Sequence, residues 1–118
     1  MIKMAYLRKE KQTVEIDYAL NKVWAAIPAV LTSLEWTVEQ TDDASHHMRV
    51  KTKAGFMSYS STLTIDGVPL DEKTSRVTVK AETPVTTITS IADFGRTKER
   101  IQLFFEALAA QLNSRKKS

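Results

Sequence analysis

The chain has 118 residues, of which 42% are hydrophobic and 26% are charged, and it contains no cysteine. This composition indicates one globular domain, which at this length buries enough surface to fold without a disulfide or a structural metal ion. The absence of cysteine excludes disulfides and thiolate metal sites, and no apolar run approaches the roughly 20 residues that a membrane-spanning helix needs. We therefore expect a soluble, cytoplasmic protein.

The net charge of +3 is concentrated at the two ends of the chain. The segments 1–11 and 115–117 each carry a net charge of +3, so the remaining residues carry a net charge of −3. Terminal segments of this kind are commonly mobile and solvent-exposed. We expect a basic N-terminal tail at 1–11, a single α+β domain at 12–113 and a basic C-terminal tail at 114–118.

The first unit of the domain is predicted to be a strand followed by a helix. Residues 12–18 alternate between polar and apolar side chains, which indicates a half-buried strand. Apolar residues then recur at three- and four-residue steps over 20–34, which indicates an amphipathic helix. Pro28 lacks the N–H that a helix interior needs, so we expect either a kink there or two short helices with Pro28 in the first turn of the second.

Alternation with a period of two returns after this helix and predicts four further strands. They are the segments 36–40, 48–54, 59–65 and 77–81. A polar turn follows the first of them, Ala54 and Gly55 mark a tight hairpin, and Asp66 and Gly67 open a loop that runs to Thr74. Short connections of this kind favour antiparallel pairing in a meander.

The end of the chain is predicted to be a long helix. Residues 83–91 fit neither the strand nor the helix period, so we predict a loop there and leave strand character at 86–89 open. Asp93 is a candidate N-cap, and apolar side chains then recur at helical spacing to about Asn113.

The element order β-α-β-β-β-β-α resembles the helix-grip architecture of START-type and birch-pollen-allergen-like proteins. It resembles equally the β-α-β₄-α half-repeat of TATA-binding-protein-like folds, and it is similar to small bacterial domains of unknown function. The residues that carry the resemblance are the segment Val14 to Tyr18, the pair Val23 and Trp24, the strand with Trp36, and the segment Asp93 to Arg96. The resemblance implies an α+β fold, with an antiparallel sheet of four to six strands packed against a kinked N-terminal helix and a long C-terminal helix.

A sheet that curls around one long helix favours a cavity, because the two surfaces diverge at their ends. We predict that a small hydrophobic or amphipathic ligand binds between the sheet and the last helix. The predicted lining residues are Trp36, Tyr59, Ser61, Phe104 and Leu108. Tyr59 and Ser61 are in phase with apolar neighbours, as is Thr52 on the preceding strand, and buried hydroxyls need partners. The alternative interpretation is that these residues form an ordinary packed core.

The sequence indicates no catalytic, metal or cofactor site. His46 and His47 are adjacent, so on a regular strand they point to opposite faces and cannot both ligate one metal ion. A phosphate-binding glycine loop and a Ser/His/Asp pattern are both missing. The periodicity places all 14 acidic residues outward, on turns or at helix ends. We therefore expect a protein that is not an enzyme.

A protein–protein interaction or self-association module is the second hypothesis. Val85, Ile88 and Ile91 motivate it, because three apolar residues in an irregular segment are typical of a surface patch.

Electrostatic binding of nucleic acid is the least favoured hypothesis. His47, Arg49, Lys51 and Lys53 share the solvated phase of one predicted strand, and Lys80 continues this row on another. Every aromatic residue of the predicted strands falls on the opposite phase, where it cannot stack on bases. Such a row also serves any half-exposed strand by keeping it soluble.

Overall fold

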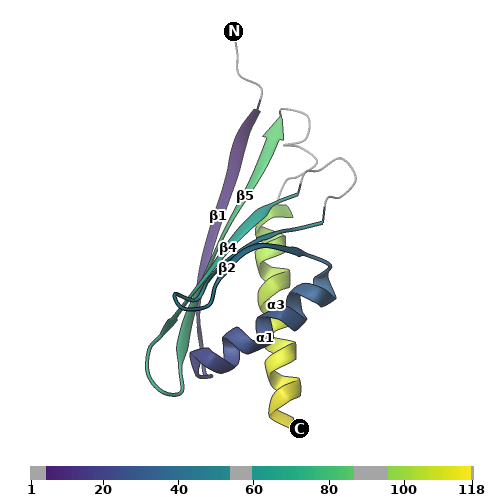
Figure 1. Cartoon of the computed structure of the whole chain (residues 1–118). Coiled ribbons are helices and arrows are strands. Elements are labelled where there is room, and N and C mark those ends of the chain that lie inside the picture. Colours follow the sequence, from purple (N-terminus) through teal and green to yellow (C-terminus); the bar gives the residue numbers. More distant parts are fainter. Residues whose placement is uncertain (1–4, 54–59, 87–95, 118) are drawn as a thin grey trace.

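The computed structural model describes residues 5–53, 60–86 and 96–117 (Figure 1). The described chain consists of five strands and two helices. In chain order they are β1 (Ala5–Ile16), α1 (Leu20–Leu34), β2 (Thr37–Asp42), β3 (His47–Lys51), β4 (Thr62–Pro69), β5 (Ser75–Thr86) and α3 (Arg96–Lys117). The predicted α+β class and element order are therefore confirmed.

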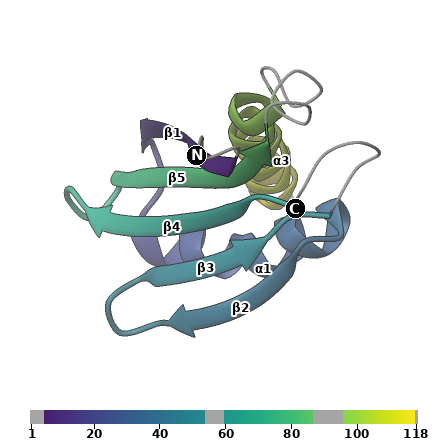
Figure 2. The same ribbon diagram turned by 90° about the horizontal axis from the view of Figure 1, so that it is seen from above.

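The five strands form one antiparallel sheet in the order β1-β5-β4-β3-β2. The first strand pairs with the last because the intervening strands form a meander that brings β5 back beside β1. Both helices lie against the same face of this sheet (Figures 1 and 2). We call the face that they cover the inner face and the opposite one the outer face.

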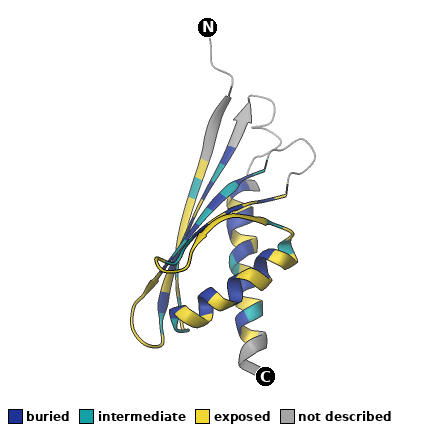
Figure 3. Ribbon diagram, viewed as in Figure 1, coloured by how far each residue is buried: buried dark blue, intermediate teal, exposed yellow. Residues whose placement is uncertain are grey.

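The core lies between the inner face and the two helices (Figure 3). Alternate residues of β3, β4 and β5 are buried, as their period-two pattern predicts. The helices add one stripe each at three- and four-residue spacing. The largest fully buried side chains include Phe104, Ile27, Leu31, Leu63, Ile65, Ile101 and Leu108.

The strand β1 begins at Ala5, seven residues earlier than predicted. Residues 5–11 were expected to form a basic tail, yet they pair with β5 in a regular register, for example Ala5 with Thr86 and Lys11 with Lys80. This stretch is rich in charge, so its sequence carries no clear alternation. The backbone pairing offered by β5, twelve residues long, decides its structure.

Gly67 lies inside β4 and not in the predicted loop, because β4 runs on to Pro69. A Cβ atom at this position would lie 2.7 Å from Leu20 Cδ1. The glycine therefore permits the first turn of α1 to approach the sheet closely. Asp66 and Gly67 resemble a turn in sequence, which led to the prediction of a loop. The glycine is needed here for close packing and not for a reversal of the chain.

The structure also decides the form of the two helices. Pro28 lies inside a single helix, which excludes one of the two expected forms, the division into two short helices. The helix α3 continues to Lys117, through most of the predicted tail at 114–118. Asp93, the predicted N-cap, is outside the described residues. None of the described helices is long and apolar enough to cross a membrane.

The strand β5 extends to Thr86, so residues 83–86 belong to a strand and not to the predicted loop. Its extension is the part that pairs with the early residues of β1. Val85 is in this strand, whereas Ile88 and Ile91 lie outside the described residues. The structure therefore does not describe the proposed apolar patch as a whole.

Candidate functional site

The helix α3 crosses the inner face of the sheet and makes two different environments with it (Figure 1). We call them the Arg100 end and the Leu112 end, after one buried residue in each. Twelve residues of helix separate Arg100 from Leu112, which corresponds to roughly 18 Å along the axis.

The Arg100 end is polar and filled. Ser61, Thr83 and Thr97 are fully buried, and the Arg100 side chain leaves only 9% of the residue exposed. The Ser61 and Thr83 hydroxyls are hydrogen-bonded to each other, and Thr83 Oγ1 lies 2.8 Å from Thr97 Oγ1. Arg100 Nη1 donates to Ser61 Oγ at 2.5 Å. These bonds connect α3 to β5 and to Ser61, which directly precedes β4, so the cluster fastens the helix to the sheet.

Ser61, which directly precedes β4, is also hydrogen-bonded to Thr52, which directly follows β3. The Ser61 backbone N–H donates to Thr52 Oγ1 at 2.8 Å, and Thr52 is buried. The predicted inward direction of Ser61 and Thr52 is therefore confirmed. Sequence reasoning did not select Thr97 or Arg100, although they lie four residues before Ile101 and Phe104 and thus share the buried stripe.

The Leu112 end holds a pocket of about 150 Å³ between β1 and α3. Its lining residues are Val14, Ile16, Tyr18, Phe105, Leu108, Ala109, Leu112 and Asn113. Nearly all of the exposed lining is apolar. The Tyr18 hydroxyl donates to the Leu112 carbonyl at 3.5 Å, which connects the two walls. An apolar cavity of about this volume in another protein stays dry and accepts a benzene-sized molecule.

A broad depression of about 1030 Å³ adjoins this pocket, and its lining is about as polar as it is apolar. The two hollows share Tyr18, Leu112 and Asn113, so they lie side by side. The other lining residues of the depression are Asp17, Ala19, Asn21, Lys22, Glu72 and Lys73. The apolar pocket therefore borders a hollow that holds side chains of both charges.

The β4–β5 loop at the rim of the depression is ordered by Asp71. Its Oδ1 accepts hydrogen bonds from the backbone N–H groups of Lys73 at 2.7 Å and Thr74 at 2.8 Å. The bond from Lys73, followed by the bonds from Thr74, lowers the pKa of Asp71 below its ordinary value of 3.8.

The structure does not bring the five predicted lining residues into one pocket. Leu108 lines the pocket at the Leu112 end, whereas Ser61 belongs to the polar cluster at the Arg100 end. Phe104 is fully buried in the core, and Trp36 is partly buried against it. Tyr59 lies outside the described residues. The alternation of Val14, Ile16 and Tyr18 was the signal that could have indicated the pocket wall.

One acidic residue lies on the inner phase, contrary to the expectation that all of them face outward. Glu10 pairs with Ala81, which is fully buried on the inner face. Paired residues of an antiparallel sheet lie on the same face, so Glu10 lies on the inner face too, where it is half-buried. The error arose because residues 1–11 were expected to be a tail.

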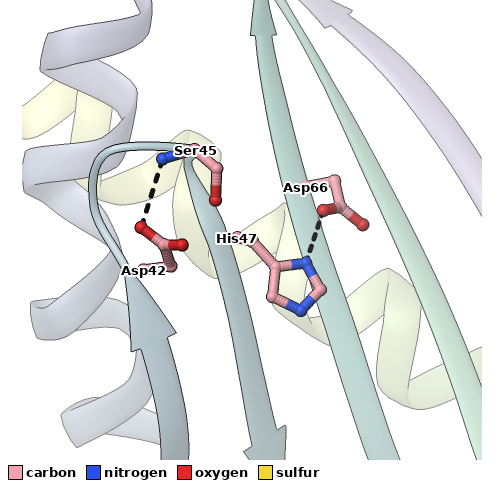
Figure 4. A network of polar contacts seen from close by, with 4 residues as sticks. All are labelled: Asp42, Ser45, His47 and Asp66. Carbon is pink, nitrogen blue, oxygen red and sulfur yellow. Dashed lines mark hydrogen bonds and ion pairs between the residues drawn. The ribbon is translucent and has the colours of Figure 1, made fainter.

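The two histidines have separate surroundings. His47 Nδ1 lies 2.6 Å from Asp66 Oδ1 on the neighbouring strand, beside the turn that Asp42 closes (Figure 4). His46 has a left-handed φ of 54° and packs its ring edge-on against Trp24, with centroids 5.3 Å apart. Among the described residues, no group of three acidic or histidine side chains is placed to hold a metal ion.

Comparisons by sequence find no matching family model and no matching curated protein. Comparison by structure finds norcoclaurine synthase of Thalictrum flavum, as a point mutant with a transition-state analogue. That likeness has a TM-score of 0.73 and 9% identity, and it covers 98% of this chain and 99% of that one. The chain has the helix-grip fold. The helix-grip expectation is therefore confirmed.

Two further helix-grip structures show the same likeness. Ara h 8.0201 has a TM-score of 0.71 and 10% identity over 92% of this chain and 99% of its own. An uncharacterised protein of Bacillus thuringiensis has a TM-score of 0.64 and 15% identity over 91% and 98%. At these identities the likeness is one of fold.

Proposed function

We propose that this protein reversibly binds a small amphipathic molecule at the Leu112 end, without catalysing a reaction. The apolar part of the ligand occupies the pocket between β1 and α3, and its polar part faces the adjoining depression. The observation that carries the proposal is the apolar pocket of about 150 Å³, which adjoins the larger depression at three shared residues. Clefts that are mostly apolar with a few polar groups are typical ligand sites.

The size of the pocket limits the ligand. A volume of about 150 Å³ accommodates one aromatic ring or a short branched alkyl group. Tyr18 and Asn113 stand where the pocket meets the depression, so a hydroxyl or amide of the ligand can bond there. Lys22 and Glu72 lie farther out and favour a ligand whose polar part is small or carries both charges.

The chemistry of the lining supports binding over catalysis. Apart from the Tyr18 phenol, which donates to the Leu112 carbonyl, the eight residues around the pocket carry no group that commonly acts as a general acid or base. Glu10 is on the same face of the sheet but does not line the pocket.

The proposal is tested by filling the pocket from its rim. Ala109 lines the pocket and is exposed, whereas Ala110 is equally exposed on the same helix and does not line it. We expect Ala109→Trp to abolish binding of toluene and p-cresol, measured by NMR titration of backbone amides, and Ala110→Trp to leave it unchanged. In the wild-type protein, the changes in amide chemical shift should cluster on residues 14–18 and 105–113.

Three results would count against this site. They are the absence of saturable shifts with either probe, equal binding by the two tryptophan variants, or shifts that cluster at the Arg100 end. Native mass spectrometry of the protein from its own cells then identifies the natural ligand as a mass adduct that Ala109→Trp no longer retains.

A further inference from the structure

The outer face of the sheet is not covered by either described helix (Figures 2 and 3). Its residues form rows across the paired strands. The pairing registers define the members of each row. One row consists of Lys11, Lys80, Thr64, Arg49 and Gln40, taken from β1 to β2. We call it the cationic row, because it holds three basic side chains and no carboxylate.

The neighbouring rows contain carboxylates as well as basic side chains, and the row of Lys9 and Glu82 also holds the exposed Lys51. Lys9 lies 3.8 Å from Glu82 in the row on one side, and His47 contacts Asp66 in the row on the other side. One row farther along, Arg76 lies 3.1 Å from Glu15. Each of these rows therefore places a carboxylate beside a basic residue.

The cationic row differs from its neighbours because it contains no carboxylate within the part of the chain that the structure describes. Lys11, Lys80 and Arg49 are exposed, and none of them makes an ion pair with a described residue. Lys11 stands directly opposite Lys80, an arrangement that destabilises a sheet. Strands are about 4.8 Å apart, so the three charges span roughly 14 Å in a line.

The width of the row decides which anion fits it. The adjacent rows lie roughly 7 Å away along the strands and expose the carboxylates of Glu82 and Asp66. A DNA duplex or a lipid surface is much wider than this and would meet those carboxylates. A single-stranded nucleic acid is narrow enough, but the cationic row and the two beside it hold no Phe, Tyr or Trp for its bases, and the imidazole of His47 is engaged with Asp66.

We propose that the cationic row is a docking surface for an extended acidic segment of a partner protein. Such a segment is one chain wide and places alternate carboxylates roughly 7 Å apart, within reach of the flexible lysine stems and of Arg49. The Thr64 hydroxyl lies between Lys80 and Arg49 and supplies a hydrogen-bond donor to the same line. This surface is on the opposite side of the sheet from the proposed ligand site.

The test is the binding of a fluorescein-labelled hexaglutamate peptide, measured by fluorescence anisotropy at low and at physiological salt. We expect saturable binding that weakens as salt rises, because the attraction is between exposed charges. Lys80→Glu should weaken binding roughly tenfold or more at low salt. Lys98→Glu, an exposed residue of α3 with the same change in net charge, should bind as the wild type does.

The Lys80→Glu variant also reports on folding. A glutamate at this position stands opposite Lys11 and removes the like-charge pair, so its melting temperature should rise. Loss of binding by a more stable variant cannot be attributed to misfolding. The proposal is overturned if hexaglutamate does not bind at low salt or if Lys80→Glu and Lys98→Glu bind it equally. It is also overturned if a DNA duplex or phosphatidylserine vesicles bind more tightly than the peptide and depend equally on Lys80.

Discussion

The two ends of the interface between α3 and the sheet are built from the same helix but are filled in different ways. At the Arg100 end, the hydroxyls of Ser61, Thr83 and Thr97 bond to one another and to a buried guanidinium. At the Leu112 end, aliphatic side chains of β1 remain only half-buried beside a pocket of about 150 Å³. The first end is closed by a network of directed bonds, whereas the second is bridged by the long bond from Tyr18 to the Leu112 carbonyl and otherwise by apolar contacts.

This difference shows that the most apolar residues need not mark the ligand site. Phe104 lies between the two ends and is fully buried, so it has no surface left for a ligand. Phe105, its neighbour, is only partly buried and lines the pocket. Available space follows from incomplete packing at the margin of the core, where the sheet and the helix diverge.

The largest expected effect comes from truncating the residue between the two ends. Phe104→Ala should lower the free energy of unfolding by about 3–5 kcal/mol, because it removes a fully buried ring and leaves a cavity. Leu112→Ala should cost about 2 kcal/mol, since that side chain already borders open space. Urea unfolding measures both values. Equal costs would show that the two ends are packed equally well.

A smaller effect is expected from removing the guanidinium charge at the Arg100 end. Arg100→Met keeps the length of the side chain but removes the donor to Ser61, and it should cost about 2 kcal/mol of unfolding free energy. Lys98→Met, an exposed change on the same helix, should cost less than about 0.5 kcal/mol. A neutral or stabilising Arg100→Met would show that the polar cluster does not fasten the helix.

The smallest expected effect concerns the β4–β5 loop, which lies at the rim of the depression beside the Leu112 end. The pKa of Asp71 is lowered in the folded state, so its carboxylate stabilises the protein above pH 3.8, and this contribution is lost as the pH falls further. Asp71→Ala should therefore melt slightly below the wild type at pH 6, and the difference should shrink as the pH falls below 3.8. Thermal melts across this range measure it. A difference independent of pH would assign the effect to the loop backbone and not to the carboxylate.

Much of the fold could be predicted from the sequence because burial leaves a periodic pattern. Leu63 and Ile65 alternate with polar residues, and Ile101, Phe104 and Leu108 follow helical spacing, and all of them are buried as expected. The early part of β1 could not be predicted, because Lys9, Glu10 and Lys11 show no alternation and are held by pairing with β5. Gly67 was misread because a glycine needed for close packing resembles a glycine needed for a turn.

The candidate site was less predictable than the fold. Leu108 was correctly placed at the interface and does line the pocket, but Trp36, Ser61 and Phe104 are elsewhere. The pocket combines a strand near the start of the chain with a helix near its end, about 90 residues apart. A pattern in one segment reports which side chains are buried and does not report how completely distant segments fill the space between them.

By itself, the sequence determined the order of the elements, the inward phase of the central strands and the buried stripe of the last helix. These follow from local spacing, since the periods of strands and helices differ. Only the tertiary structure decided which face Glu10 occupies, which hydroxyls Arg100 meets, where space remains beside Leu112 and which cations line up across the outer face. Each of these depends on register or on packing between segments far apart in the chain, and neither is encoded in the spacing within one segment.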